Sequence, residues 1–85
     1  MRAYGYEADR PTDDDEQAQP LRLREVTLGC SFDDIRRVAR FVNEVLAVID
    51  SGDVEPRPGW HMHFRDRDAN WTKEEADLIL AWRQD

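Results

Sequence analysis

The chain has 85 residues, of which 40% are hydrophobic and 36% charged, and its net charge is −7. This length allows a single small domain, residues 1–85, and excludes a multidomain enzyme or a large ligand cavity. An acidic chain lacks the Lys/Arg footprint that binds a nucleic-acid backbone, so we expect no nucleic acid among its partners.

The sequence also indicates where the protein is found. No apolar run approaches the ~20 residues that span a bilayer, and the first residues lack the apolar stretch of a secretory signal. The single cysteine, Cys30, cannot form a disulfide within the chain. We therefore expect a soluble cytoplasmic protein with no membrane partner.

Two short segments open the chain. Tyr4 and Tyr6 alternate within residues 2–8, which favours a strand. Residues 9–20 have two prolines and no large apolar residue, so we expect a flexible acidic loop there. Its acidic cluster has two interpretations, a solvated linker or a segment that binds a basic partner: Asp13, Asp14, Asp15 and Glu16.

The next predicted element is a strand over residues 21–30. Val26, Leu28 and Cys30 alternate, and the β-branched residues favour strand structure. Cys30 lies just before a predicted helix, where a thiol can become nucleophilic. No nearby residue is spaced to act as its base, so we expect a buried structural cysteine instead.

A long helix is predicted over residues 32–51. Ser31 and Asp34 form a shortened capping box, and Gly52 is placed to end the helix. Apolar residues recur at helical spacing: Phe32, Ile35, Val38, Phe41, Val42, Val45, Leu46 and Ile49. Charged residues form two predicted i, i+4 pairs: Asp33 with Arg37, and Arg40 with Glu44.

Two strands complete the predicted fold. Residues 60–66 alternate strictly between two faces: Trp60, Met62 and Phe64 against His61, His63 and Arg65. Residues 73–83 fit a helix or a strand, and propensity slightly favours a helix at 73–77. We predict a strand over 77–83, because a sheet that covers a long helix needs more than two strands. The sequence therefore predicts an α+β fold of order β-β-α-β-β, a mainly antiparallel sheet with one long helix packed on one face.

The histidines are the candidate metal ligands. His61 and His63 would project from the same face of a strand, as in a two-histidine metal grip. A third ligand would have to come from another part of the chain or from a second copy: Cys30, Asp66 or Asp68. Because such a pair occurs often by chance, we predict no metal, no cofactor and no catalytic residue, and hence no enzyme. A small metal-dependent enzyme using the two histidines is kept as a third hypothesis.

Three tryptophans lie in the last third of the chain: Trp60, Trp71 and Trp82. They could all pack under the helix, or some could anchor an interface, where Trp is enriched. A domain this small, with open strand edges, is expected to form a homodimer. The candidate interface residues are Trp60, His61, His63 and Trp82.

The order of motifs resembles a known family. These are YGY at 4–6, LREVTL at 23–28, SFDDIRRVARF at 31–41, HMHF at 61–64 and DLILA at 77–81. Across residues 3–83 the chain is similar to small actinobacterial proteins grouped with an immunity-protein family, family thirty-two, of bacterial polymorphic toxin systems. The resemblance implies an α+β fold and a non-enzymatic binding role, and it transfers no catalytic residue.

The leading functional hypothesis is a cytoplasmic binding protein that neutralises a toxin by burying a surface. An acidic inhibitor can imitate a phosphate backbone and associate quickly with a basic toxin groove. The candidate contacts are acidic: Asp13, Asp14, Asp15, Glu16, Asp66, Asp68, Glu74 and Glu75. The alternative is a stand-alone structural or regulatory homodimer with no toxin.

Overall fold

The computed structural model of the chain describes residues 1–6, 20–55 and 57–83. Its elements are, in order, β1 (Ala3–Gly5), β2 (Leu21–Leu23), α1 (Phe32–Ser51), β3 (His61–His63), α2 (Phe64–Arg67) and β4 (Ile79–Ala81). The predicted α+β class and the bounds of the long helix are confirmed. Within these residues no helix has the length and apolar character needed to cross a membrane.

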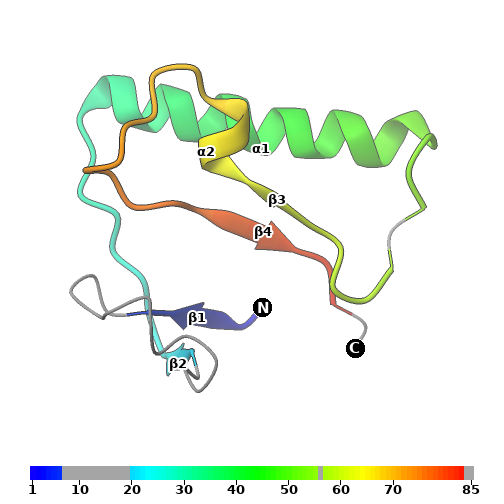
Figure 1. Cartoon of the computed structure of the whole chain (residues 1–85), viewed down its shortest axis with the longest axis horizontal. Helices are drawn as coiled ribbons and strands as arrows, with labels where there is room; N and C mark the ends of the chain where they lie inside the picture. The colour runs from blue at the N-terminus through cyan, green and yellow to red at the C-terminus, as the bar shows by residue number, and fades with distance from the viewer. Residues whose placement is uncertain (7–19, 56, 84–85) are drawn as a thin grey trace.

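The strands form two separate antiparallel sheets instead of the single predicted sheet. β1 pairs with β2, with Ala3 opposite Leu23, and β3 pairs with β4, with Met62 opposite Leu80. Figure 1 shows α1 lying along the β3–β4 hairpin, while β1 and β2 lie beyond the other side of that hairpin. The helix therefore packs on only half of the strands that were expected to receive it.

All four strands are shorter than predicted. The strand predicted over 2–8 is confirmed only at Ala3–Gly5, with residues 7 and 8 outside the described residues, and the one over 21–30 ends at Leu23. The segment 60–66 divides into β3 and the turn of α2, because the polar run after Phe64 suits a turn better than a half-buried strand. The segment 77–83 is a strand, as predicted, over Ile79–Ala81.

Local signals at both ends of α1 explain its length. The Ser31 hydroxyl accepts the Asp34 backbone N–H at 3.1 Å, and the Asp34 carboxylate accepts the Ser31 N–H at 3.1 Å. This is the predicted capping box. At the other end Gly52 takes a left-handed conformation with φ 73°, and its N–H donates to the carbonyl of Ile49. Glycine adopts this conformation without the steric cost that a Cβ would bring.

The core is small and lies between α1 and the β3–β4 hairpin. Phe41, Val45 and Phe64 are buried. The rings of Phe41 and Phe64 meet edge to face with centroids 5.5 Å apart, a favourable aromatic geometry. Partly buried side chains surround them: Trp60, Met62, Trp71, Leu78 and Leu80. This cluster holds α1, α2, β3 and β4 together as one body.

Candidate functional site

A polar cluster centres on Arg37 of α1, whose side chain is only 12% exposed. Its Nε–H donates to Asp68 at 2.9 Å, and its two terminal nitrogens donate to Glu75 at 2.9 and 3.1 Å. A further bond of 3.0 Å reaches Asp34. The guanidinium carbon lies 5.4 Å from the centre of the Phe64 ring. Arg37 therefore ties the helix to the segment between α2 and β4.

The carboxylates of this cluster are stabilised in their charged form. Hydrogen bonds from Arg37 are the main cause that holds the pKa of Asp68 and of Glu75 below the usual values. The pKa of Asp34 is lowered first by the Ser31 backbone N–H and then by Arg37. The same pairing, above all with Glu75, raises the pKa of Arg37. Because all three carboxylates bond to Arg37, we assign the cluster a structural role.

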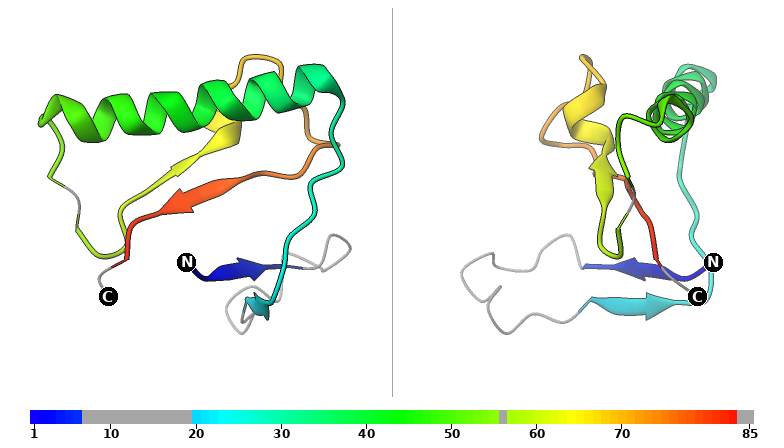
Figure 2. Two further views of the ribbon diagram at one scale, coloured as in Figure 1. Left: turned by 180° about the vertical axis from the view of Figure 1, so that it is seen from behind. Right: turned by 90° about the vertical axis from the view of Figure 1, so that its right-hand side faces the viewer.

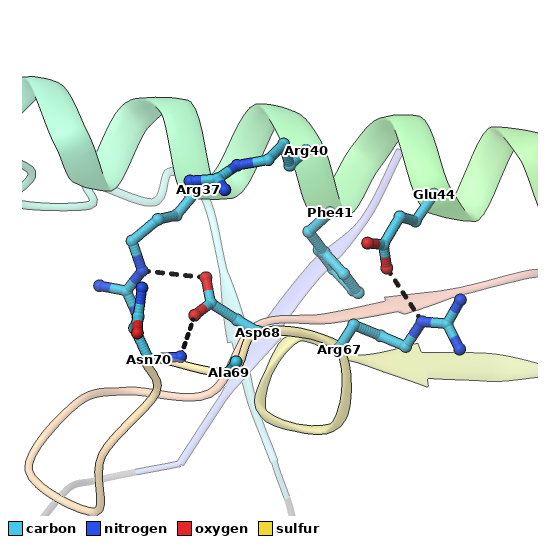
Figure 3. A pocket seen from close by; sticks show the side chains of 8 residues that line it. All are labelled: Arg37, Arg40, Phe41, Glu44, Arg67, Asp68, Ala69 and Asn70. Atoms are coloured by element: carbon cyan, nitrogen blue, oxygen red, sulfur yellow. Dashed lines mark hydrogen bonds and ion pairs between the residues drawn. The ribbon is translucent and has the colours of Figure 1, made fainter.

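Beside this cluster lies a pocket of about 200 Å³, which Figure 3 shows in close view. Asp68 faces Arg37 on one side of it, and Arg67 bonds to Glu44 at 3.0 Å on the other. Its volume falls below the about 300 Å³ at which ligand pockets usually begin. The lining residues are Arg37, Arg40, Phe41, Glu44, Arg67, Asp68, Ala69 and Asn70. We interpret it as a hollow between α1 and α2 instead of a substrate site.

The two histidines lie side by side on β3, as the alternation predicts. Their ring centroids are 5.1 Å apart. Nδ1 of His63 lies 2.6 Å from Asp77, which also accepts the backbone N–H of Arg65 at 3.0 Å. Burial raises the pKa of Asp77, but the bonds from His63 and Arg65 outweigh it and leave the pKa lowered. Nδ1 of His61 donates to the Gly59 carbonyl at 2.8 Å, because that oxygen can only accept.

The arrangement offers a metal fewer ligands than the usual sites have. Two imidazoles fall short of the three protein ligands of a catalytic zinc site. Asp68, one candidate third ligand, is bonded to Arg37. Across residues 1–6, 20–55 and 57–83 no three His, Cys, Asp or Glu side chains lie together so as to hold a metal. That the protein needs no metal stays a prediction.

The acidic candidates divide into two groups. Asp68 and Glu75 are engaged in the Arg37 cluster, whereas Asp66 and Glu74 are exposed. The remaining four lie outside the described residues: Asp13, Asp14, Asp15 and Glu16. Of the candidate acids, Asp66 and Glu74 are therefore the described ones that are accessible to a partner.

The tryptophans divide in a similar way. Trp60 and Trp71 pack against the core, and the Trp71 indole N–H donates to the Ala76 carbonyl at 3.1 Å. Trp82, just after β4, remains 37% exposed. The hypothesis that all three pack under the helix is therefore wrong for Trp82, and a role of Trp82 in an interface stays a prediction.

The apolar face of α1 is only half covered. Phe41 and Val45 face the core, but a row of apolar side chains beside them on the helix surface stays exposed. We call this row the α1 stripe, and it consists of Ile35, Val42, Leu46 and Ile49, exposed by 54, 37, 49 and 38%. It lies on the opposite flank of the helix from Arg37, which faces the α2 side. Phe32 was expected on the packed face, but it is 82% exposed because no element reaches the first turn.

The segment that leads into the helix, residues 24–30, is a second exposed feature, which we call the arm. Figure 1 shows it as an extended trace from β2 to α1. Every one of its residues is exposed, and Val26 and Leu28 are exposed by 53 and 48%. Cys30 is therefore not the buried structural residue that the sequence suggested. The predicted strand fails here because no strand among residues 1–6, 20–55 and 57–83 pairs with the arm.

The sequence did not reveal the Arg37 cluster. The predicted pairs Asp33/Arg37 and Arg40/Glu44 are wrong: Asp33 bonds to Arg36, and Glu44 to Arg67. Besides Asp34, Arg37 bonds to residues 31 and 38 positions away, and no local pattern encodes such a distance. The available signal is that Arg37 lies one turn before Phe41, on the flank of the buried face.

Comparisons with known proteins were made against families, curated proteins and solved structures. No protein-family model matches the chain, and no curated protein or solved structure is significantly similar to it. The resemblance to an immunity-protein family therefore stays a prediction.

Proposed function

We propose that this chain is a non-enzymatic protein-binding domain that acts by burying an apolar surface. The α1 stripe carries this proposal. A helix in a water-soluble protein normally covers its apolar face, and a continuous exposed row of four large aliphatic side chains marks an interaction surface. The polar side chains that converge in the described residues are paired with one another around Arg37 and Asp77, which supports a binding role over a chemical one.

In-cell photocrosslinking tests this proposal. A photoreactive phenylalanine analogue is placed at Leu46 in the stripe and, as the matched control, at Arg40, which is exposed about 120° around the same helix. We expect position 46 to crosslink to a second copy, or to a co-expressed neighbouring gene product, at several times the yield of position 40. Equal yields at the two positions would contradict the proposal.

The specific candidate within this class is an immunity protein that neutralises a basic toxin. The net charge of −7, the exposed Asp66 and Glu74, and the resemblance described above support it. An acidic surface is attracted to the basic groove of a toxin that cleaves nucleic acid. The alternatives remain a stand-alone structural or regulatory homodimer and, third, a small metal-dependent enzyme using His61 and His63.

Co-expression with the product of the neighbouring gene tests the immunity proposal. We expect survival with the native chain, loss of protection when Asp66 and Glu74 are both changed to Lys, and retention with the control Glu55→Lys, which alters a distant exposed acid. If cells die equally with and without the native chain, and no complex forms at low salt, the immunity proposal is wrong and the homodimer alternative takes its place.

A further inference from the structure

We propose that two copies of this chain form a dimer by exchanging arms. Residues 24–30 of each copy add as a third strand to the open edge of β4 in the other copy. This inference rests on the proposed function, a protein-binding domain that works by surface burial, and it names the partner as a second copy. Three features carry it: an unpaired strand edge, an unpaired arm with the sequence of a strand, and the uncovered α1 stripe.

The open edge belongs to β4. In the β3–β4 ladder the Phe64 N–H donates to the Leu78 carbonyl at 2.8 Å, and the Trp82 N–H donates to the Trp60 carbonyl at 2.7 Å. Backbone groups alternate in direction along an antiparallel strand, so those of Ile79 and Ala81 point away from β3. A two-stranded sheet is marginally stable alone, and an unpaired edge is a template for another strand.

The arm has the properties of the missing strand. Within the described part of the chain, no backbone hydrogen bond is made by residues 24–30. Backbone N–H and C=O groups that lack a protein partner are available to hydrogen-bond with another strand. Val26 and Leu28 share one face, and Val26, Thr27 and Leu28 have high strand propensity. The arm is therefore an extended segment with strand sequence and no partner.

The arm does not fill the edge of its own copy. It runs from the start of α1 to β2, which is occupied by pairing with β1. Figure 1 shows the arm running down from α1 to β2, across the direction of β4, so it does not lie along the β4 edge of its own copy. Each copy thus has one arm and one open edge. In a dimer with two-fold symmetry, the arm of each copy pairs with the edge of the other.

The uncovered stripe fits the same arrangement. In the right-hand view of Figure 2, α1 overhangs β4 on the side away from α2. A strand added at the β4 edge lies under this overhang, so its inward side chains, Val26 and Leu28, cover the stripe. The arm, the stripe and β4 supply 14 residues on each side, so the interface lies below the about 20 residues a side of a standard-size complex and is of the small class.

Light scattering on purified full-length chain tests the proposal, with reductant present because Cys30 is exposed. The native chain is expected at twice its mass of 10.0 kDa. The arm variant V26P/T27P removes strand hydrogen bonds from an unpaired segment, so it does not disturb the folded body. It should weaken dimerisation by roughly 100-fold. The control Thr27→Val keeps the strand propensity and should remain a dimer.

The edge variant Ala81→Pro removes an N–H that points away from β3, so the hairpin is preserved while the docking edge is blocked. Each variant alone should be monomeric. A mixture of the two should form heterodimers, because the intact arm of the edge variant meets the intact edge of the arm variant. An arm that closed on its own β4 would give no such complementation.

Several outcomes would overturn arm exchange. One is a native chain that stays monomeric to 500 µM, roughly the upper range of a weak association. Others are a dimer that survives both variants, or a mixture that stays monomeric. If Ala81→Pro fails to fold, hydrogen exchange of the native chain decides instead: protection of the Ile79 and Ala81 amides must rise with protein concentration. Crosslinking from position 46 without these effects would leave the binding function standing and refute the exchange.

Discussion

Replacing Phe41 with alanine is expected to remove about 3–5 kcal/mol of stability, which is most of what a domain of this size has. Phe41 is 2% exposed and is one of three buried residues in the described chain. Its ring meets the edge of Phe64, so the cavity left by alanine would open the centre of the core. Few other side chains are available to fill that space.

Phe32→Ala is the matched control, since it removes the same side chain from the same helix. Phe32 is 82% exposed, and we expect its loss to change stability by no more than about 0.5 kcal/mol. Urea unfolding followed by circular dichroism measures both values. Similar midpoints for the two variants would show that the packing of α1 on the β3–β4 hairpin is incorrect.

Arg37→Met should also destabilise the fold strongly. The change keeps an aliphatic chain over Phe64 but removes the hydrogen bonds to Asp34, Asp68 and Glu75. The carboxylates would then face one another without a cation. We expect the melting temperature to fall by on the order of 10 °C.

The neighbouring Arg36→Met is the control for charge and helix propensity. Arg36 pairs with Asp33, and both side chains are well exposed, so the pair contributes little. We expect its melting temperature to stay within about 2 °C of the native value. A fall as large as that of Arg37→Met would show that the cluster has no special role.

The dependence of stability on pH gives a second measure of the same cluster. The folded pKa values of Asp68 and Glu75 lie below their unfolded values of 3.8 and 4.5. These carboxylates therefore contribute stability that is complete above those unfolded values and is lost as the pH falls through the lower folded values. Arg37→Met should flatten the loss of stability below about pH 4.5. An unchanged acid profile would contradict the assignment.

Sequence reasoning succeeds here where the determinants are local. The capping box at Ser31 and the glycine at 52 define α1 because both signals act within one turn of the helix. The strand predicted over 77–83 is also confirmed, although the local sequence fits a helix as well. The strand forms because it pairs with β3, and this partner was expected from the whole fold and not from the local sequence.

Sequence reasoning fails where a segment depends on a distant neighbour. The pattern of residues 21–30 indicates a strand, yet hydrogen bonding stops at Leu23 because no strand among the described residues lies beside the arm. Two of the three partners of Arg37, Asp68 and Glu75, are distant in sequence, so charge spacing along the helix pointed to the wrong pairs. The sequence predicts the candidate binding residues only in part. The shared face of His61 and His63 follows from alternation along the strand, but the exposure of the α1 stripe could not be predicted, because it depends on where the rest of the fold lies.

The extended, exposed arm has a consequence for turnover. Proteases bind their substrates as extended strands, and the arm presents this shape with Arg24 at its start and Arg22 just before it, where trypsin-like enzymes cut. Pairing in a dimer would shield the cleavage sites, because a strand within a sheet cannot enter a protease cleft. Dilute chains would therefore be degraded faster than concentrated ones, so the lifetime of the protein would depend on how much of it the cell has made.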